Sequence, residues 1–225
     1  IDLLIEIMNL IGDVAFAVNL HWGYKEVAKE LSEMTGLPVK TGNDANVAAL
    51  GEMWCGGGRG TDSMVMITLG TGVGGGVIIG GKMVSGAHGA GGEIGHICID
   101  PEDPIACNCG NHGCLEQKTS ATGIVRLAKE ELVKNEMPSM LDAATVTAKD
   151  VFEAYGKGDP LARVVVKRMA DYLGRAMAMI AATIDPEKFV IGGGVSKAGL
   201  PLIDAVSSAY EKYCFISCIY RFILD

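Results

Sequence analysis

The chain has 225 residues, of which 49% are hydrophobic and 20% are charged, and its formal net charge is −8. This composition is ample for a buried core, in one large domain or two small ones, and it excludes a globally disordered chain. The acidic balance argues against a nucleic-acid partner, which needs basic patches, and no apolar run is long enough to cross a bilayer, which argues against a membrane protein.

The N-terminal segment does not have the pattern of a signal peptide. Residues 1–18 are largely apolar, but Asp2, Glu6, Asn9 and Asp13 interrupt them and they lack a basic start. Since nothing in the sequence directs the chain to an oxidising compartment, we expect a cytoplasmic protein. Its cysteines are then expected to be thiols or metal ligands rather than disulfides.

The first part of the chain predicts helices and strands in alternation. Apolar residues at helical spacing predict a helix over Tyr24–Thr35, which Gly36 ends, and a short strand over Leu37–Thr41. Asn43 or Asp44 can cap the helix that follows. Beyond it we expect a helix over 45–55, a buried strand over Met64–Leu69, a turn over the glycines 70–76, a return strand over Val77–Ile79 and a third strand near Met83.

After a segment over Glu93–Glu116 that is mostly loop, the sequence predicts long helices. The largest has an apolar stripe from Leu161 to Ile180, and its small residues, such as Gly174, are expected to let a neighbouring element approach closely. The other predicted elements are a helix over 120–135, a helix over 148–155 capped by Thr147, a strand over 188–194 that enters a glycine turn, and a helix from Pro201 to about Tyr213. Strands mixed with long helices indicate an α/β or α+β architecture.

One short segment has the spacing of a metal site. Cys107, Cys109 and Cys114 supply three soft ligands on a glycine-rich loop, and His96 is the natural fourth ligand of a closed, structural zinc site. A reduced cysteine cluster without metal, or a disulfide, is the alternative interpretation. Cys98 and His112 are possible substitute ligands, whereas we expect Cys55, Cys214 and Cys218 to be packing residues.

Two glycine-rich segments admit a structural and a functional interpretation. Gly70, Gly72 and Gly75 satisfy G-x-G-x-x-G, but a strand is predicted after them where a dinucleotide-binding turn requires a helix. The segment is then either a plain turn or a hairpin whose backbone N–H groups bind an anion. The second segment, Ile191–Gly199, is either a flexible loop or a place where the backbone approaches a flat ligand such as adenine.

Four polar residues are candidates for substrate chemistry. Asn43 and Asp44 stand at a junction between a predicted strand and a predicted helix, where they are either a helix cap or a general base with an orienting amide. Glu93 and Glu116 flank the predicted zinc loop. They are either surface carboxylates or groups held in place to accept hydrogen bonds from a polyol.

Together these stretches resemble the ROK family of sugar kinases and repressors. The motifs "NDANVAALGE", "TLGTGVGGG", "EIGH", "CNCGNHGCLE" and "IGGGVSKAG" occur in the family's order and approximate spacing, from about Asn19 to Tyr213. The resemblance implies the α/β, actin-like (ribonuclease H-like) sugar kinase fold. In that fold, residues 1–41 are expected to be a remnant of the first lobe, and residues 42–225 the second lobe with its zinc-stabilised loop.

The resemblance also implies an activity and a set of roles. The expected activity is ATP-dependent phosphorylation of a hexose, of glucokinase type, by a homodimer with structural zinc and Mg-ATP and without a nucleic-acid or membrane partner. Asp44 is implied as the catalytic base, Asn43, Glu93, His96 and Glu116 as sugar-binding residues, Thr71 and Gly72 as contacts of the ATP phosphates, and Gly193 and Gly194 as neighbours of adenine. The zinc would then stiffen the sugar-binding loop rather than take part in catalysis.

The resemblance does not extend over the whole family pattern. The Asp-Gly-Gly-Thr-like phosphate loop that opens the family's kinases is not found in this sequence, and the family continues beyond the residues that match Tyr213. We therefore expect a chain that is truncated at both ends, is a poor kinase by itself and exposes apolar surface. The alternatives are an inactive sugar-binding or zinc scaffold, and a sugar-responsive repressor, which would need a helix-turn-helix that is not visible here.

Overall fold

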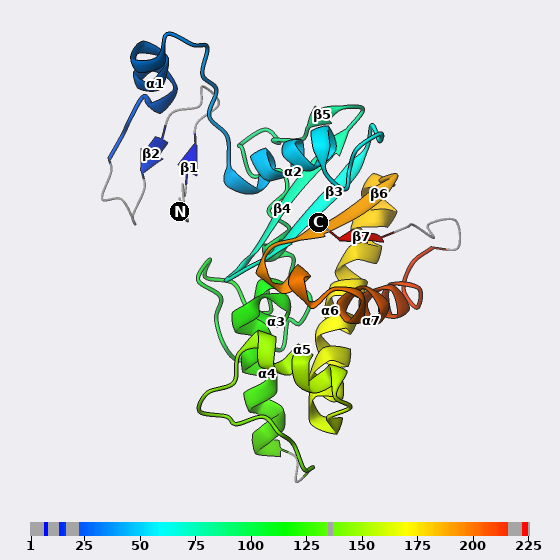
Figure 1. The fold of residues 1–225 in the computed structure, drawn as a ribbon. Helices are drawn as coiled ribbons and strands as arrows, with labels where there is room; N and C mark the ends of the chain where they lie inside the picture. Colours follow the sequence, from blue (N-terminus) through cyan, green and yellow to red (C-terminus); the bar gives the residue numbers. More distant parts are fainter. Residues whose placement is uncertain (1–6, 9–13, 17–22, 135–136, 216–221, 225) are drawn as a thin grey trace.

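The computed structural model describes residues 7–8, 14–16, 23–134, 137–215 and 222–224 (Figure 1). The expectations for residues 1–6, 9–13 and 17–22 and for Cys218 lie outside the described residues. Seven strands are described: β1 (Ile7–Met8), β2 (Val14–Phe16), β3 (Met64–Leu69), β4 (Val73–Ile79), β5 (Lys82–Met83), β6 (Lys188–Gly192) and β7 (Phe222–Leu224). The first two form an antiparallel pair, and the others form a mixed sheet in the order β5-β4-β3-β6-β7.

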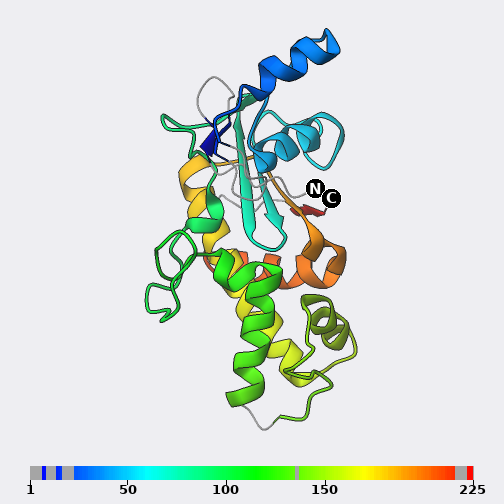
Figure 2. The same ribbon diagram turned by 90° about the vertical axis from the view of Figure 1, so that its left-hand side faces the viewer.

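Helices occupy both faces of this sheet and extend well beyond it (Figures 1 and 2). They are α1 (Val27–Thr35), α2 (Asp44–Cys55), the short η2 (Ile94–His96), α3 (Glu116–Thr119), α4 (Ala121–Lys134), α5 (Ala148–Gly156), α6 (Pro160–Ile184), η3 (Gly194–Ala198) and α7 (Leu200–Tyr210). The architecture is therefore α/β, as the sequence predicts.

The sheet separates two apolar cores because successive strand residues point to opposite faces. Val65, Ile67 and Leu69 of β3 pack with α4 to α7 in the larger core. Met64 and Met66 pack in a smaller core with Ala49 of α2. The inner strands β3 and β6 pair in parallel, so both of their carboxyl ends lie at the same edge of the sheet.

The long helix α6 matches its predicted features. Asp159 caps its N-terminus by accepting a hydrogen bond from the Ala162 N–H, and Asp185 ends it in the left-handed conformation with φ 50°. A Cβ atom on Gly174 would lie 2.6 Å from the backbone nitrogen of Tyr210, so α7 approaches this point too closely for any side chain. The prediction that small residues permit a close neighbour is confirmed.

Two local predictions are wrong. In the described part of the chain, residues 37–41 do not form a strand: most of them are exposed, and the Val39 N–H bonds to the Ser32 hydroxyl of α1. The predicted glycine turn over 70–76 is also too long. Only Gly70–Gly72 turn the chain, and β4 begins at Val73 and includes the next three glycines.

The surface is uneven in polarity. Helix α1 has no buried residue, and on α2 the side chain of Trp54 is 83% exposed.

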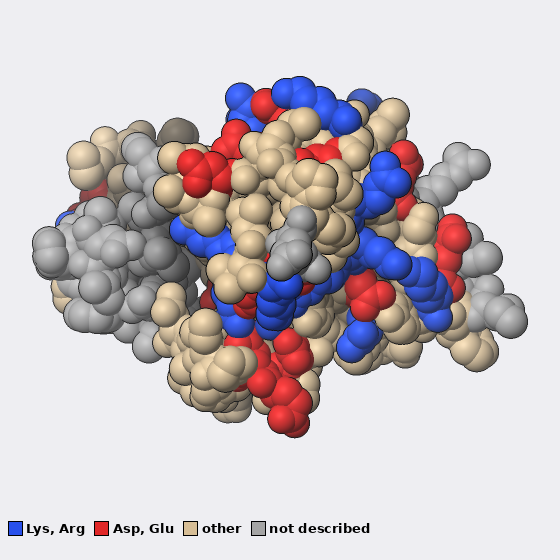
Figure 3. Space-filling view, turned by 90° about the horizontal axis from the view of Figure 1, so that it is seen from below, with Lys and Arg blue, Asp and Glu red and all other residues tan. Residues whose placement is uncertain are grey.

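Seen from below, lysine and arginine side chains form a band with acidic groups on both sides of it, so the net negative charge is not spread evenly (Figure 3). Among the described residues, no helix combines the length and the apolar character that crossing a membrane requires.

Candidate functional site

The predicted metal ligands lie together. The ligand atoms of His96, Cys107, Cys109 and Cys114 all lie within 4.8 Å of one another. Cys109 Sγ is 3.5 Å from Cys114 Sγ, and Cys107 Sγ is 3.9 Å from His96 Nδ1. A tetrahedral ion with bonds of about 2.0–2.3 Å needs donors roughly 3.3–3.8 Å apart. The four donor atoms can therefore hold a four-coordinate metal ion.

The loop that carries these cysteines is closed by its own backbone. The Cys107 N–H donates to the Asn111 carbonyl at 2.7 Å, and the Leu115 N–H donates to the Ile97 carbonyl at 2.9 Å. Gly113 has φ 69°, and a Cβ atom there would lie 1.8 Å from the carbonyl oxygen of Asp100. Only glycine fits this close approach, so the chain can turn back sharply enough to place Cys114 beside Cys109.

The thiols of the cluster differ in acidity. Burial, with the neighbouring thiols Cys109 and Cys107, raises the pKa of the Cys114 thiol well above its ordinary value. A hydrogen bond from the backbone N–H of Asn111 lowers the pKa of the Cys109 thiol. A thiolate is the ligand form of cysteine, so Cys109 is the sulfur most readily available to a cation, and a bound cation would favour ionisation of the other two.

The suggested substitute ligands have other partners. Cys98 Sγ donates to the His112 carbonyl at 3.3 Å, and His112 Nδ1 lies 2.9 Å from the Asp103 carbonyl oxygen. Neither residue belongs to the donor cluster. The prediction that Cys55 is a packing residue is wrong because its side chain is exposed at the end of α2, whereas Cys214 packs at the edge of the larger core.

Glu116 joins the metal cluster to the turn between β3 and β4. Its Oε1 accepts a hydrogen bond from Cys107 Sγ at 3.0 Å. Its Oε2 would lie 2.8 Å from a Cβ atom on Gly72. The structure therefore brings together two residues that the sequence places in separate motifs.

The glycines of β4 let both neighbouring elements lie directly on the strand. A Cβ atom on Gly76 would meet the Ala49 side chain of α2 at 2.4 Å. One on Gly75, which points to the opposite face, would meet the carbonyl oxygen of Gly92 at 2.5 Å. These glycines thus place α2 and the segment before His96 against the same strand, and the turn itself is left to Gly70, Thr71 and Gly72.

The N-terminus of α2 holds Asn43 and Asp44 in different roles. Asn43 is the N-cap, because its Oδ1 accepts the Asn46 N–H at 3.2 Å. Asp44 is exposed at the first helical position, where its Oδ1 accepts the Ala45 N–H at 2.8 Å. The sequence analysis did not identify Asn46 as a candidate. Its Oδ1 is buried and has no hydrogen-bond partner among the described residues. This oxygen would lie 3.6 Å from a Cβ atom built on Gly92.

The four residues expected to contact nucleotide lie at one edge of the sheet. Thr71 and Gly72 follow β3, and Gly193 and Gly194 follow β6. Gly193 has φ 88°, and a Cβ atom there would lie 2.6 Å from the carbonyl oxygen of Leu69, whereas a Cβ atom on Gly194 would meet open space. The carboxyl ends of parallel strands are the usual place for a ligand in an α/β sheet.

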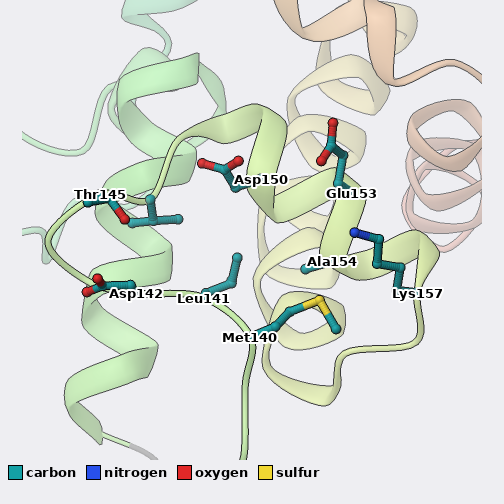
Figure 4. Close-up of a pocket in the computed structure, with 9 residues that line it drawn as sticks. Met140, Leu141, Asp142, Thr145, Asp150, Glu153, Ala154 and Lys157 are labelled. Atoms are coloured by element: carbon teal, nitrogen blue, oxygen red, sulfur yellow. The ribbon is translucent and has the colours of Figure 1, made fainter.

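Hollows in the described part of the chain include the following two. One, of about 310 Å³, borders Glu93 and has mostly apolar walls from β4, η2 and the end of α6. The other, of about 420 Å³, lies between α5 and the segment before it, where Asp142, Asp150 and Glu153 line it together with Lys157 (Figure 4). The second hollow contains none of the predicted site residues.

A charged cluster beneath the loop between Cys98 and Cys114, called the metal loop below, could not be predicted from the sequence. Burial would raise the pKa of the Asp103 carboxyl, but hydrogen bonds from Arg126 and Lys118 outweigh it and hold that pKa well below its usual range. Burial would lower the pKa of Lys118, but Asp100 and Asp103 outweigh it and raise that pKa. No sequence spacing identifies these partners, because they come from three separate elements.

Comparison with known proteins relates this geometry to a family. The sequence model of the ROK family matches residues 5–218. A glucokinase of Halalkalibacterium halodurans is 48% identical over 206 residues, which cover 90% of this chain and 62% of that relative. The chain therefore spans less than two thirds of the length of this curated relative.

Solved structures show the same similarity. The structure of a ROK family glucokinase from Streptomyces griseus, in complex with glucose and AMPPNP, has a TM-score of 0.81 at 33% identity and covers 98% of this chain and 74% of that chain. A ROK family transcriptional regulator, a homologue of the E. coli MLC protein, has a TM-score of 0.83 at 30% identity, covering 97% and 55%. The fold is accordingly the actin-like sugar kinase fold.

Proposed function

Because the chain belongs to the ROK family, we propose that it contains the sugar-binding and metal-binding lobe of an ATP-dependent hexose kinase that converts glucose to glucose 6-phosphate. The observation that carries this proposal is the convergence of the four donor atoms of His96, Cys107, Cys109 and Cys114 within 4.8 Å of one another. Glu116 lies beside them, with Oε1 3.0 Å from Cys107 Sγ and Oε2 in the space that Gly72 leaves open. Residues 42–225 form the second lobe in this proposal, and residues 1–41 belong to the first.

Zinc is the metal proposed for the four donors. Three thiols and one imidazole, within 4.8 Å of one another, are a typical closed structural zinc set, which leaves no position for a reacting molecule. The ion would supply rigidity to the loop between His96 and Cys114. It would thereby hold His96 and Glu116 in one arrangement.

The sugar is proposed to lie against Asn43, Asp44, Glu93, His96 and Glu116. Carboxylates and an imidazole suit adjacent hydroxyl groups because each can accept or exchange a hydrogen bond. The buried Oδ1 of Asn46 supports this placement, since a buried acceptor without a partner favours a nearby donor such as a sugar hydroxyl.

Asp44 is proposed as the general base. Its carboxylate would take the proton from the 6-hydroxyl as that oxygen bonds to the γ-phosphorus of ATP and the bond to the ADP oxygen breaks. Thr71 and Gly72 would face the phosphates, and Gly193 and Gly194 would face adenine. Positioning of the reactants and Mg²⁺ supply most of the stabilisation of the transition state in phosphoryl transfer. The contribution of this chain would therefore be chiefly to align the sugar hydroxyl with the γ-phosphate.

A sugar-responsive regulator is the second candidate, favoured by the similarity to the solved ROK transcriptional regulator. The two candidates differ in turnover. We expect the full-length protein to form ADP in the presence of glucose and Mg-ATP, with lower activity on mannose and N-acetylmannosamine, and we expect an Asp44→Asn variant to bind glucose without comparable turnover. Glucose binding in the full-length protein without ADP formation would support the regulator or a scaffold and contradict the kinase.

A further inference from the structure

The metal loop rests on a cluster of buried charges that lies outside the donor set. Lys118 of α3 is only 3% exposed. Its Nζ lies 2.7 Å from Asp100 Oδ2 and 2.8 Å from Asp103 Oδ2. Both acids belong to the segment that enters the loop, whereas Lys118 follows the segment that leaves it. The ammonium therefore ties the two ends of the loop together.

Two further elements hold the same acids. Arg126 Nη2 of α4 lies 2.5 Å from Asp103 Oδ1, and the Tyr172 hydroxyl of α6 donates to Asp100 Oδ2 at 3.2 Å. The Lys118 ammonium also lies 5.3 Å from the centre of the Tyr172 ring, a favourable cation–π position. Arg126 also pairs with Glu130 of α4 through its Nε at 3.1 Å, so the two acids are held by Lys118 and by contacts that anchor them to α4 and α6.

Three consecutive residues of α3 reach back to the loop. Glu116 bonds to Cys107, and Gln117 accepts the Cys114 N–H at 3.2 Å and donates to the Ile105 carbonyl at 2.9 Å. Lys118 completes this series at the base of the loop. Of the three, only Lys118 forms buried ion pairs, in which both partners carry a full charge. Electrostatic interactions are strongest at buried positions, and a buried charge that loses its partner is strongly destabilising.

We propose that Lys118 is a positioning residue for the metal site and for Glu116, because it locks the base of the loop between Cys98 and Cys114 in the shape in which the four donors converge. This inference rests on the proposed metal and sugar site, but the lock itself requires neither metal nor sugar. Without the ammonium, the ion pairs that tie Asp100 and Asp103 in the entering segment to α3 are lost, so the two ends of the loop can separate. The donors and Glu116 then lose their common geometry.

The experiment compares three variants of the full-length protein with the wild type. Lys118→Met removes the ammonium and keeps much of the side-chain volume. Tyr172→Phe removes only the hydroxyl bond to Asp100, so it keeps the test available if Lys118→Met does not fold. Asp159→Ala is the matched control, because it breaks a buried cap of α6 whose hydrogen-bond partners, Ser139, Met140 and Ala162, lie outside the metal loop.

The first readout is amide hydrogen exchange in metal-free protein, which is independent of metal and of activity. We expect Lys118→Met to accelerate exchange over 98–115, including the Ile99 and Cys107 amides, at least about tenfold, and Tyr172→Phe to do so about two- to fivefold. Asp159→Ala should lower the midpoint of thermal unfolding and leave this exchange unchanged. The proposal would be overturned if Lys118→Met and Tyr172→Phe both exchanged these amides at the wild-type rate, or if Asp159→Ala accelerated their exchange equally.

The second readout is the rate of zinc release to a chromogenic chelator, with glucose affinity measured on the same samples. Lys118→Met should release zinc at least about tenfold faster and bind glucose correspondingly more weakly, while the control keeps wild-type values. If the wild type holds no zinc, the proposed metal fails, yet the exchange experiment still decides whether Lys118 locks the loop. Unchanged zinc release from a Lys118→Met variant with accelerated exchange would overturn the link to the metal site.

Discussion

Gly72 leaves the space that the carboxylate of Glu116 occupies, because a Cβ atom at position 72 would lie 2.8 Å from Glu116 Oε2. The second glycine of the turn is thereby coupled to a residue at the edge of the metal loop. Because Glu116 Oε1 also lies 3.0 Å from Cys107 Sγ, we expect a change at Gly72 to shift Glu116 relative to the four donors. This contact joins the proposed nucleotide side to the proposed sugar side.

The Gly72→Ala substitution tests this coupling. The added methyl group displaces the end of a flexible side chain rather than backbone, so the free energy of unfolding should change by less than about 1 kcal/mol. We expect glucose affinity to fall about tenfold, measured by calorimetry. Gly70→Ala in the same turn meets open space and is the matched control. Equal affinities for glucose in both variants would contradict the coupling.

The Cys109→Ser substitution tests the metal site. The hydroxyl is a far weaker ligand than a thiolate, so we expect metal content after desalting to fall from about one zinc per chain to a small fraction of it. Cys98→Ser, which changes a thiol outside the donor cluster, should retain the metal. Elemental analysis measures both. A wild-type protein that is free of metal and still binds glucose normally would rule out the structural zinc.

The Asp44→Asn substitution tests the proposed base in the full-length protein. Turnover should fall by about 10²–10⁴, the usual range for the loss of a positioned base, while glucose affinity stays within a few-fold. Helix α2 should remain intact, because its cap is the side chain of Asn43. Steady-state kinetics and a thermal unfolding curve are sufficient measurements. If turnover stays the same, Asp44 is only part of the helix terminus.

Asp103 makes the stability of the fold dependent on pH. Its pKa is held below the unfolded value, so its contribution is present above that value, which is about 4, and is lost as the pH falls through the folded pKa. Asp103→Asn should lower the free energy of unfolding at pH 7 by about 3 kcal/mol or more, since it leaves buried cations underpaired. Urea unfolding should show this difference shrinking below pH 4. A difference that is constant with pH would contradict the assignment.

The Gly174→Ala substitution tests the contact between α6 and α7. Alanine favours a helix over glycine by about 1 kcal/mol, but here its methyl group would lie 2.6 Å from the backbone of Tyr210. We expect a net destabilisation of about 1–3 kcal/mol from this overpacking. Gly51→Ala in α2 meets open space and should be neutral or stabilising. Chemical denaturation of the two variants compares them directly.

Features that depend on neighbouring residues could be predicted from the sequence. The strand over Met64–Leu69 has its predicted bounds, and Thr147 forms the N-terminal capping box of α5 with Asp150. The spacing of Cys107, Cys109 and Cys114 also identified the donors that the structure brings together. The cap and the cysteine spacing lie within a few residues of one another, so local patterns contain the necessary information. The bounds of β3 follow from its own apolar run, although its partner β6 is distant in the chain.

The sequence by itself therefore indicated strands mixed with long helices, the main helices, and the four residues His96, Cys107, Cys109 and Cys114 that the structure brings together. Only the tertiary structure decided that Gly74–Gly76 lie in a strand, because that outcome depends on α2 and the segment before His96 packing on its two faces. It also decided that Lys118 meets Asp100 and Asp103 and that Glu116 meets Gly72. Such contacts join segments that are distant in the chain, and no spacing pattern in the sequence predicts which residues will meet. They depend on how closely the backbones pack in the folded protein.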